Sequence, residues 1–140
     1  MLEEIDLNEK GVKWLNKTTD ALVTVLKQEF PDKPIYEDEI PKDKLEEVGY
    51  QYNHIVYETG NIQRAQPDSK GLNQEVIVTY YSENKDNLDG VMITLISILE
   101  GTHYYKLSEA FKGITQKAET EDFVDAVEVR LTRQIKYDQY

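Results

Sequence analysis

The strongest constraint on the fold lies near the C-terminus, where residues 125–137 read DAVEVRLTRQIKY. Apolar side chains take alternate positions there, at Val127, Val129, Leu131, Ile135 and Tyr137. Successive side chains of a β-strand point to opposite faces, so this alternation predicts a strand with one buried face and one solvated face. Arg133 interrupts the apolar side.

Four further segments have the character of strands. Residues 74–83, QEVIVTYYSE, are apolar almost throughout, which is typical of a central strand or of one covered on both faces. Residues 50–60, YQYNHIVYETG, are rich in β-forming side chains and predict a strand to Gly60. The first residues of the polar loop that follows could continue this strand. We also expect a short extended piece over residues 35–40, and a strand or bent hairpin arm over residues 104–119.

Two segments have the period of a helix with one apolar face. The first stripe stops before Pro31, which ends the helix, and comprises Leu15, Thr19, Leu22, Val23, Leu26 and Phe30. Its start is open, because any of residues 18–20 could cap it or a longer helix could begin near Asn8. The second stripe stops before Gly101 and comprises Leu88, Val91, Met92, Leu95, Ile96 and Leu99.

The order of these segments predicts one α+β domain over residues 1–140, a length typical of a single domain. We expect a mixed, largely antiparallel sheet with the two main helices packed on one face. Residues 18–137 form the domain in this interpretation, and residues 1–17 form an N-terminal extension.

The composition narrows the classes of function. The chain has 27 acidic and 16 basic residues, a net charge of −11, which repels nucleic acid at long range. It has no cysteine, so thiolate metal sites are excluded. The acidic N-terminus does not resemble a secretory signal, and the most apolar stretch, residues 91–99, is too short to cross a membrane.

The stretch NKDNLDG, residues 84–90, raises the question of a calcium loop. A loop of that kind would place Lys85 at the first ligand position and Ile96 at the position of the bidentate acid, and neither side chain offers a carboxylate. Asn84, Asp86 or Asn87 is therefore predicted to cap the helix that follows.

Catalytic patterns are equally weak. His54 and His103 have no metal-binding spacing, and no serine lies in a nucleophile elbow. Glu37 and Glu39 share one face of an extended chain, with Asp38 on the other, and paired acids of this kind serve glycosidases or bind Mg²⁺. A solvated sheet edge is the favoured interpretation. The sequence predicts a protein that is not an enzyme and needs no metal or cofactor.

Several segments resemble, in order, the small tail terminator (tail completion) proteins of long-tailed bacteriophages of Gram-positive hosts. They are ALVTVLKQEFPDKPIYEDEIPK, NHIVYETG, LNQEVIVTYYSENKDNLD and DAVEVRLTRQIKY. The resemblance covers about residues 18–137, and residues 1–17 extend beyond it. It implies a mixed sheet flanked by helices and a homohexameric ring that caps the tail tube and meets the head connector.

The resemblance also implies partners and a place in the cell. The partners are further copies of the chain, the tail tube protein and the head-completion protein, in a virion assembled in the host cytoplasm. Genomic DNA passes through such a ring without specific binding, and no membrane is involved.

The contacts between copies are expected from two parts of the chain. The polar loop over residues 61–73 contains Pro67 and two bases, Arg64 and Lys70, which could pair with Glu37 or Asp38 of the next copy. Glu39 belongs to the same acidic segment. The ten tyrosines suit either ordinary sheet packing or subunit interfaces.

A second hypothesis comes from the charge alone. A small acidic domain can be an inhibitor or immunity-type protein that occupies a basic site on its partner. Such a protein binds as a monomer or dimer and with strong salt dependence.

Overall fold

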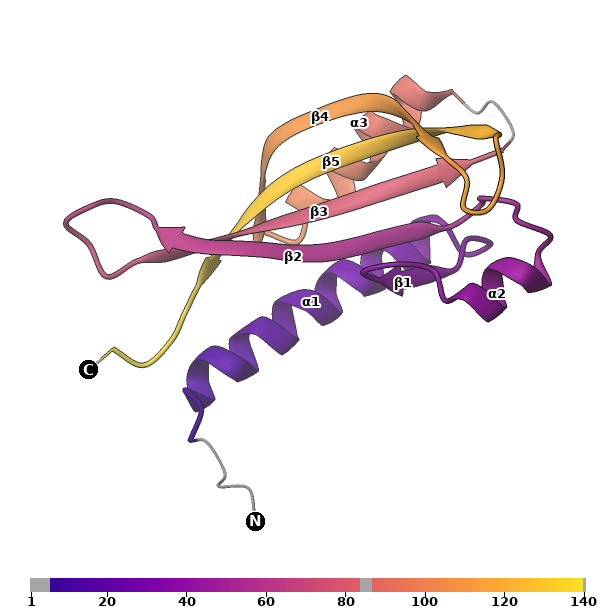
Figure 1. Ribbon diagram of the computed structural model, residues 1–140. Coiled ribbons are helices and arrows are strands. Elements are labelled where there is room, and N and C mark those ends of the chain that lie inside the picture. Colours follow the sequence, from indigo (N-terminus) through magenta and orange to yellow (C-terminus); the bar gives the residue numbers. More distant parts are fainter. Residues whose placement is uncertain (1–5, 84–86, 140) are drawn as a thin grey trace, which may run out of the picture.

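The computed structural model describes residues 6–83 and 87–139 (Figure 1). Its elements in chain order are α1 (Glu9–Glu29), β1 (Ile35–Glu37), α2 (Lys42–Glu47), β2 (Ile55–Arg64), β3 (Leu72–Ser82), α3 (Leu88–Glu100), β4 (Tyr105–Gln116) and β5 (Phe123–Ile135). The strands form one sheet in the order β1-β2-β3-β5-β4. β1 runs parallel to β2, and the other neighbours are antiparallel. The predicted α+β fold with a mixed, largely antiparallel sheet is confirmed.

One face of the sheet carries the main core. β3 is the middle strand, which accounts for its nearly continuous apolar run. β5 lies beside β3, and its alternating pattern reflects the face that packs against the main core. Both main helices pack on this face, as predicted. The fully buried side chains of this core are Leu22, Leu26, Ile55, Val76, Val78, Leu95, Leu99, Val127, Val129 and Leu131.

Among residues 6–83 and 87–139, a second core covers one end of the opposite face. Residues 41–50 contain the short helix α2, whose Leu45 packs with Tyr52, Tyr81 and Val124 in a second, smaller core. A nearly buried ion pair of 3.1 Å joins Lys117 Nζ to Glu83 beside this core.

The longer of the two possible starts for the first helix is the observed one. Asn8 caps α1, and its side chain accepts a hydrogen bond from the backbone N–H of Gly11 at 2.9 Å. Asn8 also exchanges hydrogen bonds with the backbone of Asp138. Residue 17 therefore marks no structural boundary, because the helix begins eight residues earlier and is tied to the C-terminal segment. Residues 1–5 lie outside the described part of the chain.

Arg133, which interrupts the β5 alternation, is buried and links the sheet to α1 through hydrogen bonds. Only 3% of it is exposed. Its guanidinium donates two hydrogen bonds to Gln74 Oε1 on β3, and others to Thr18 and Thr19 on α1 at 2.9 and 2.8 Å. A buried charge is tolerated when its donors are satisfied in this way.

The loop predicted over residues 61–73 is shorter than expected, because its first residues continue the preceding strand, which was the alternative that the sequence left open. β2 runs on to Arg64 and β3 starts at Leu72, so the connection is residues 65–71. A register shift between Thr59 and Ile62 lets the ladder continue past the glycine. The resulting hairpin projects from the body of the protein (Figure 1), and residues 58–71 are hereafter called the arm.

Candidate functional site

The tip of the arm is held by the C-terminal segment. Arg64 Nη1 donates hydrogen bonds to the carbonyl oxygen of Lys70 at 3.1 Å and to the hydroxyl of Tyr137 at 3.3 Å. The Tyr137 hydroxyl in turn donates to the same carbonyl. Pro67 lies in a turn closed by a hydrogen bond from Ser69 N–H to Gln66 O. The expected interface bases are therefore at the tip, but Arg64 already has partners in its own chain.

The arm exposes one edge of its outer strand. β1 pairs with residues 55–57 of β2, and within the described residues no strand continues that pairing from Glu58 to Arg64. Ile62 on this stretch is 49% exposed. Unpaired N–H and C=O groups on a strand edge are a template for pairing with another chain.

The acidic segment forms an exposed turn at the other end of β2. Glu37 is the last residue of β1, and Asp38 has a positive φ of 67° that reverses the chain. Glu39 N–H donates to Glu37 O at 2.8 Å, and all three acids are exposed. Glu37 pairs with Tyr57, far along β2 from Arg64, so one chain does not bring these acids and the arm tip together. We call residues 37–39 the acidic turn.

The calcium-loop question falls partly outside the described residues, since Asn84, Lys85 and Asp86 are not among them. Asn87 is the cap of α3, and its side chain accepts from Gly90 N–H at 3.0 Å. Asp89 in the first helical turn forms an ion pair of 2.9 Å with Lys112. Within residues 6–83 and 87–139, no group of three or more acids and histidines could hold a metal ion.

His54 is buried among the rings of three tyrosines. It is 2% exposed, and its ring centroid lies 5.8, 5.2 and 5.0 Å from those of Tyr36, Tyr52 and Tyr81. Burial, with a smaller contribution from the charge of Lys33, lowers the pKa of His54 from 6.5 to about 4. Its Nδ1 has no hydrogen-bond partner in the described part of the chain. The imidazole is therefore neutral at pH 7.

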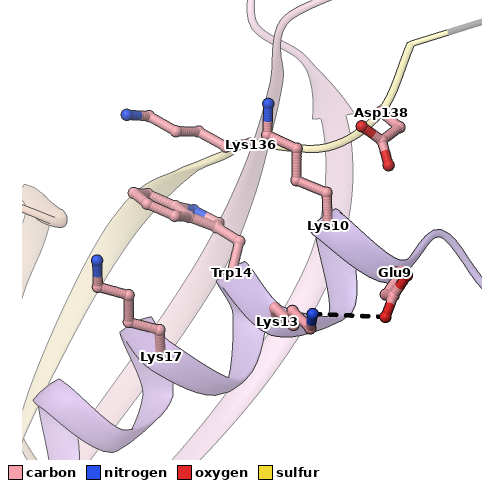
Figure 2. Close-up of a pocket in the computed structure, with 7 residues that line it drawn as sticks. All are labelled: Glu9, Lys10, Lys13, Trp14, Lys17, Lys136 and Asp138. Atoms are coloured by element: carbon pink, nitrogen blue, oxygen red, sulfur yellow. Dashed lines mark ion pairs between the residues drawn. The ribbon is translucent and has the colours of Figure 1, made fainter.

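A basic pocket surrounds the single tryptophan, and the sequence analysis missed it (Figure 2). It has a volume of about 500 Å³ and is lined by Glu9, Lys10, Lys13, Trp14, Lys17, Lys136 and Asp138. We call it the lysine pocket. The spacing of the three helical lysines was a visible signal, since residues three and four apart lie on one helix face. Lys136 joins them only through the fold.

The indole in this pocket is fixed from several sides. Trp14 Nε1 donates a hydrogen bond of 2.8 Å to the carbonyl oxygen of Gln134. The ring of Tyr104 meets the indole edge-on, with centroids 5.4 Å apart. Lys136 Nζ lies 4.8 Å and Lys17 Nζ 5.7 Å from the indole centroid, within the range of cation–π attraction. The pocket therefore presents the ammonium groups of Lys17 and Lys136 beside an indole that is fixed by its own contacts.

Comparison with known proteins leaves the family open. No protein-family model matches the chain, and no curated protein matches it. Among the described residues, no helix is both long enough and apolar enough to cross a membrane.

Proposed function

We propose that this chain is a structural virion protein that caps the phage tail tube as a homo-oligomeric ring, with six copies as the expected number. The observation that carries the proposal is the arm, a projecting hairpin whose outer strand has an unpaired edge. β4 is the strand at the other side of the sheet. Open edges on opposite sides suit a head-to-tail contact, and such contacts generate rings when the rotation closes.

Strand addition would give this contact its backbone hydrogen bonds. A two-stranded hairpin is only marginally stable alone, but β5 pairs with β3 as far as Leu72 and supports the arm on one side. Its other side is open for a neighbouring copy or for the tail tube protein. The exposed Ile62 offers apolar area at that edge.

The remaining features of the proposal follow from the resemblance to tail terminators. The ring joins the tail to the head-completion protein in the virion, and needs no catalysis, metal or cofactor. Genomic DNA passes through it without specific binding, and the net charge of −11 supports this because like charges keep DNA from adhering. Assembly takes place in the host cytoplasm, with no membrane contact.

The test compares two exposed isoleucines by sedimentation velocity. Ile62→Asp puts a charge on the open edge of the arm, and Ile93→Asp, on α3 and 68% exposed, is the matched control. We expect the wild type and the control to form a closed oligomer and Ile62→Asp to remain monomeric and folded. Ile62 is a cleaner target than Arg64, because reversing Arg64 would also break the contacts that hold the arm tip.

A particle assay tests the link to the tail. Virions made without this protein, viewed by electron microscopy, should carry overlong or headless tails, and the wild-type chain should restore them while Ile62→Asp should not. Normal tails in its absence would refute the proposal.

The acidic composition favours a second candidate, an inhibitor that occupies a basic site on a partner protein. This candidate predicts a wild type that stays monomeric or dimeric at all concentrations. It also predicts binding to a basic partner that weakens steeply between low and high salt.

A further inference from the structure

Positive charge is concentrated at one place on an acidic molecule. Four of the chain's 16 lysines and arginines line the lysine pocket, with only two acids beside them. The pocket therefore has a formal charge of +2, from four minus two, while the chain as a whole has −11. A local reversal of this size attracts an anionic group that the rest of the surface repels.

Three of the four pocket lysines form no ion pair with an acid among the described residues. Lys13 pairs with Glu9 at 3.4 Å, but Lys10, Lys17 and Lys136 form no ion pair with any described residue. All three are exposed. Figure 2 shows their ammonium groups on the same side of α1 as the indole of Trp14. A carboxylate approaching this side would meet several ammonium donors at once.

The geometry favours carboxylates over nucleic acid. A nucleobase binds an exposed tryptophan by stacking on the ring. Here the ammonium of Lys136 lies over the indole at 4.8 Å, and the ring of Tyr104 abuts it edge-on. The net charge of −11 opposes a long polyanion in addition. A short acidic peptide segment has the charge and the size to enter.

The chain itself carries such a segment, at the other end of the same helix. The acidic turn follows β1, which lies beside the C-terminal end of α1 (Figure 1). Trp14 and Glu29 are 15 residues apart along the helix, about 22 Å at 1.5 Å per residue. The turn therefore cannot reach the pocket of its own chain, whereas it can reach that of another copy.

We propose that the lysine pocket of one subunit binds the acidic turn, Glu37 to Glu39, of the next subunit. The inference rests on the proposed ring and names one of its contacts. Pocket and turn are different surfaces, so the contact is head-to-tail and leaves a free pocket and a free turn for further copies. This assigns the acids to a different set of bases from Arg64 and Lys70 at the arm tip.

Complementary charge reversal tests the pairing. The pocket variant is Lys17→Glu with Lys136→Glu, and the turn variant is Glu37→Lys with Glu39→Lys. Alone, each variant sets like charges against each other at every contact, and we expect association at least tenfold weaker than in the wild type. In an equimolar mixture, the acidic pocket of one variant meets the basic turn of the other, and the remaining contacts are native. The mixture should therefore assemble.

Sedimentation velocity at low salt reads the outcome. A control with Lys27→Glu and Lys44→Glu carries the same change in charge outside the pocket and should assemble like the wild type. The proposal is overturned if either reversed variant alone assembles like the wild type. It is also overturned if the mixture of the two reversed variants remains monomeric.

The fluorescence of Trp14 shows whether the pocket binds the acidic turn even if the chain does not form a ring. Trp14 is the only tryptophan, so fluorescence excited at 295 nm reports on the pocket alone. If the wild type does not assemble, the probe is the peptide IYEDEIP, residues 35–41, against its amide form IYQNQIP. A response to the acidic peptide alone would keep the pocket contact and reject the ring. No response, or the same response to inorganic phosphate, would reject the pocket contact.

Discussion

Acid should destabilise this protein through the buried His54. The pKa of His54 falls from 6.5 to about 4 on folding because its burial among tyrosine rings disfavours the charged form. The unfolded chain therefore binds a proton at a pH where the folded chain does not. Stability is at its full value above pH 6.5 and is lost as the pH falls from there to 4.

The size of the loss follows from the shift. A change of one pKa unit corresponds to about 1.4 kcal/mol, so a shift of roughly 2.5 units amounts to about 3 kcal/mol below pH 4. At pH 5 the unfolded state is already mostly protonated and the folded state is not, which makes the loss about 2 kcal/mol. Folded domains have only about 5–15 kcal/mol of stability, so this loss is measurable.

The assay is urea unfolding of the wild type and of His54→Phe at several values between pH 4.5 and pH 8. Other groups titrate in this range, so the informative quantity is the difference in free energy of unfolding between the two proteins at each pH. We expect the wild type to lose about 2 kcal/mol relative to the variant between pH 8 and pH 5. If Phe overfills the site, His54→Gln gives the same comparison. A difference that does not change with pH would refute a neutral, buried His54.

The remaining predictions concern stability and are measured by urea unfolding at pH 7. Leu95→Ala, at the centre of the main core, should cost about 2–5 kcal/mol, and a neutral result would mean that α3 does not carry the core. Asn87→Ala should cost about 1 kcal/mol, and Asn8→Ala about 1–2 kcal/mol, because Asn8 also bonds the C-terminal segment. Arg133→Met should cost about 2–4 kcal/mol, since it leaves the buried Gln74 without its donors, and Lys136→Met serves as the control.

Local pattern predicted the main core well. The alternation in β5 predicted the buried Val127, Val129, Leu131 and Ile135 because an antiparallel strand with one packed face repeats every two residues. The stripes of α1 and α3 did the same at the helical period. In each case the periodic spacing of apolar residues within one element was enough to predict which side chains are buried.

Long-range contacts account for the features that the sequence did not reveal. Arg133 interrupts the apolar alternation of β5, and its acceptors explain why it is buried there. Gln74 and Thr18 accept its hydrogen bonds and lie 59 and 115 residues away in the sequence. The sequence predicts a polar loop after Gly60 whose first residues could also continue the strand, and Gly60 and Asn61 are poor strand formers. Pairing of Ile62 with Gln74 carries the strand past them, so the ladder outweighs the local preference.

The two proposed contacts, at the arm and at the lysine pocket, would have different roles in assembly. Strand addition at the arm uses backbone hydrogen bonds, which are the same at every residue, so it specifies a partner strand poorly and permits slippage. A charged pocket that accepts one acidic turn fixes register and rejects wrong partners, because like charges brought together cost free energy. In the proposed ring, the arm would therefore supply much of the affinity, and the lysine pocket would set the angle between neighbouring subunits. High salt should then loosen the geometry of the ring before it separates the subunits, because salt screens exposed charges and leaves backbone hydrogen bonds nearly unchanged.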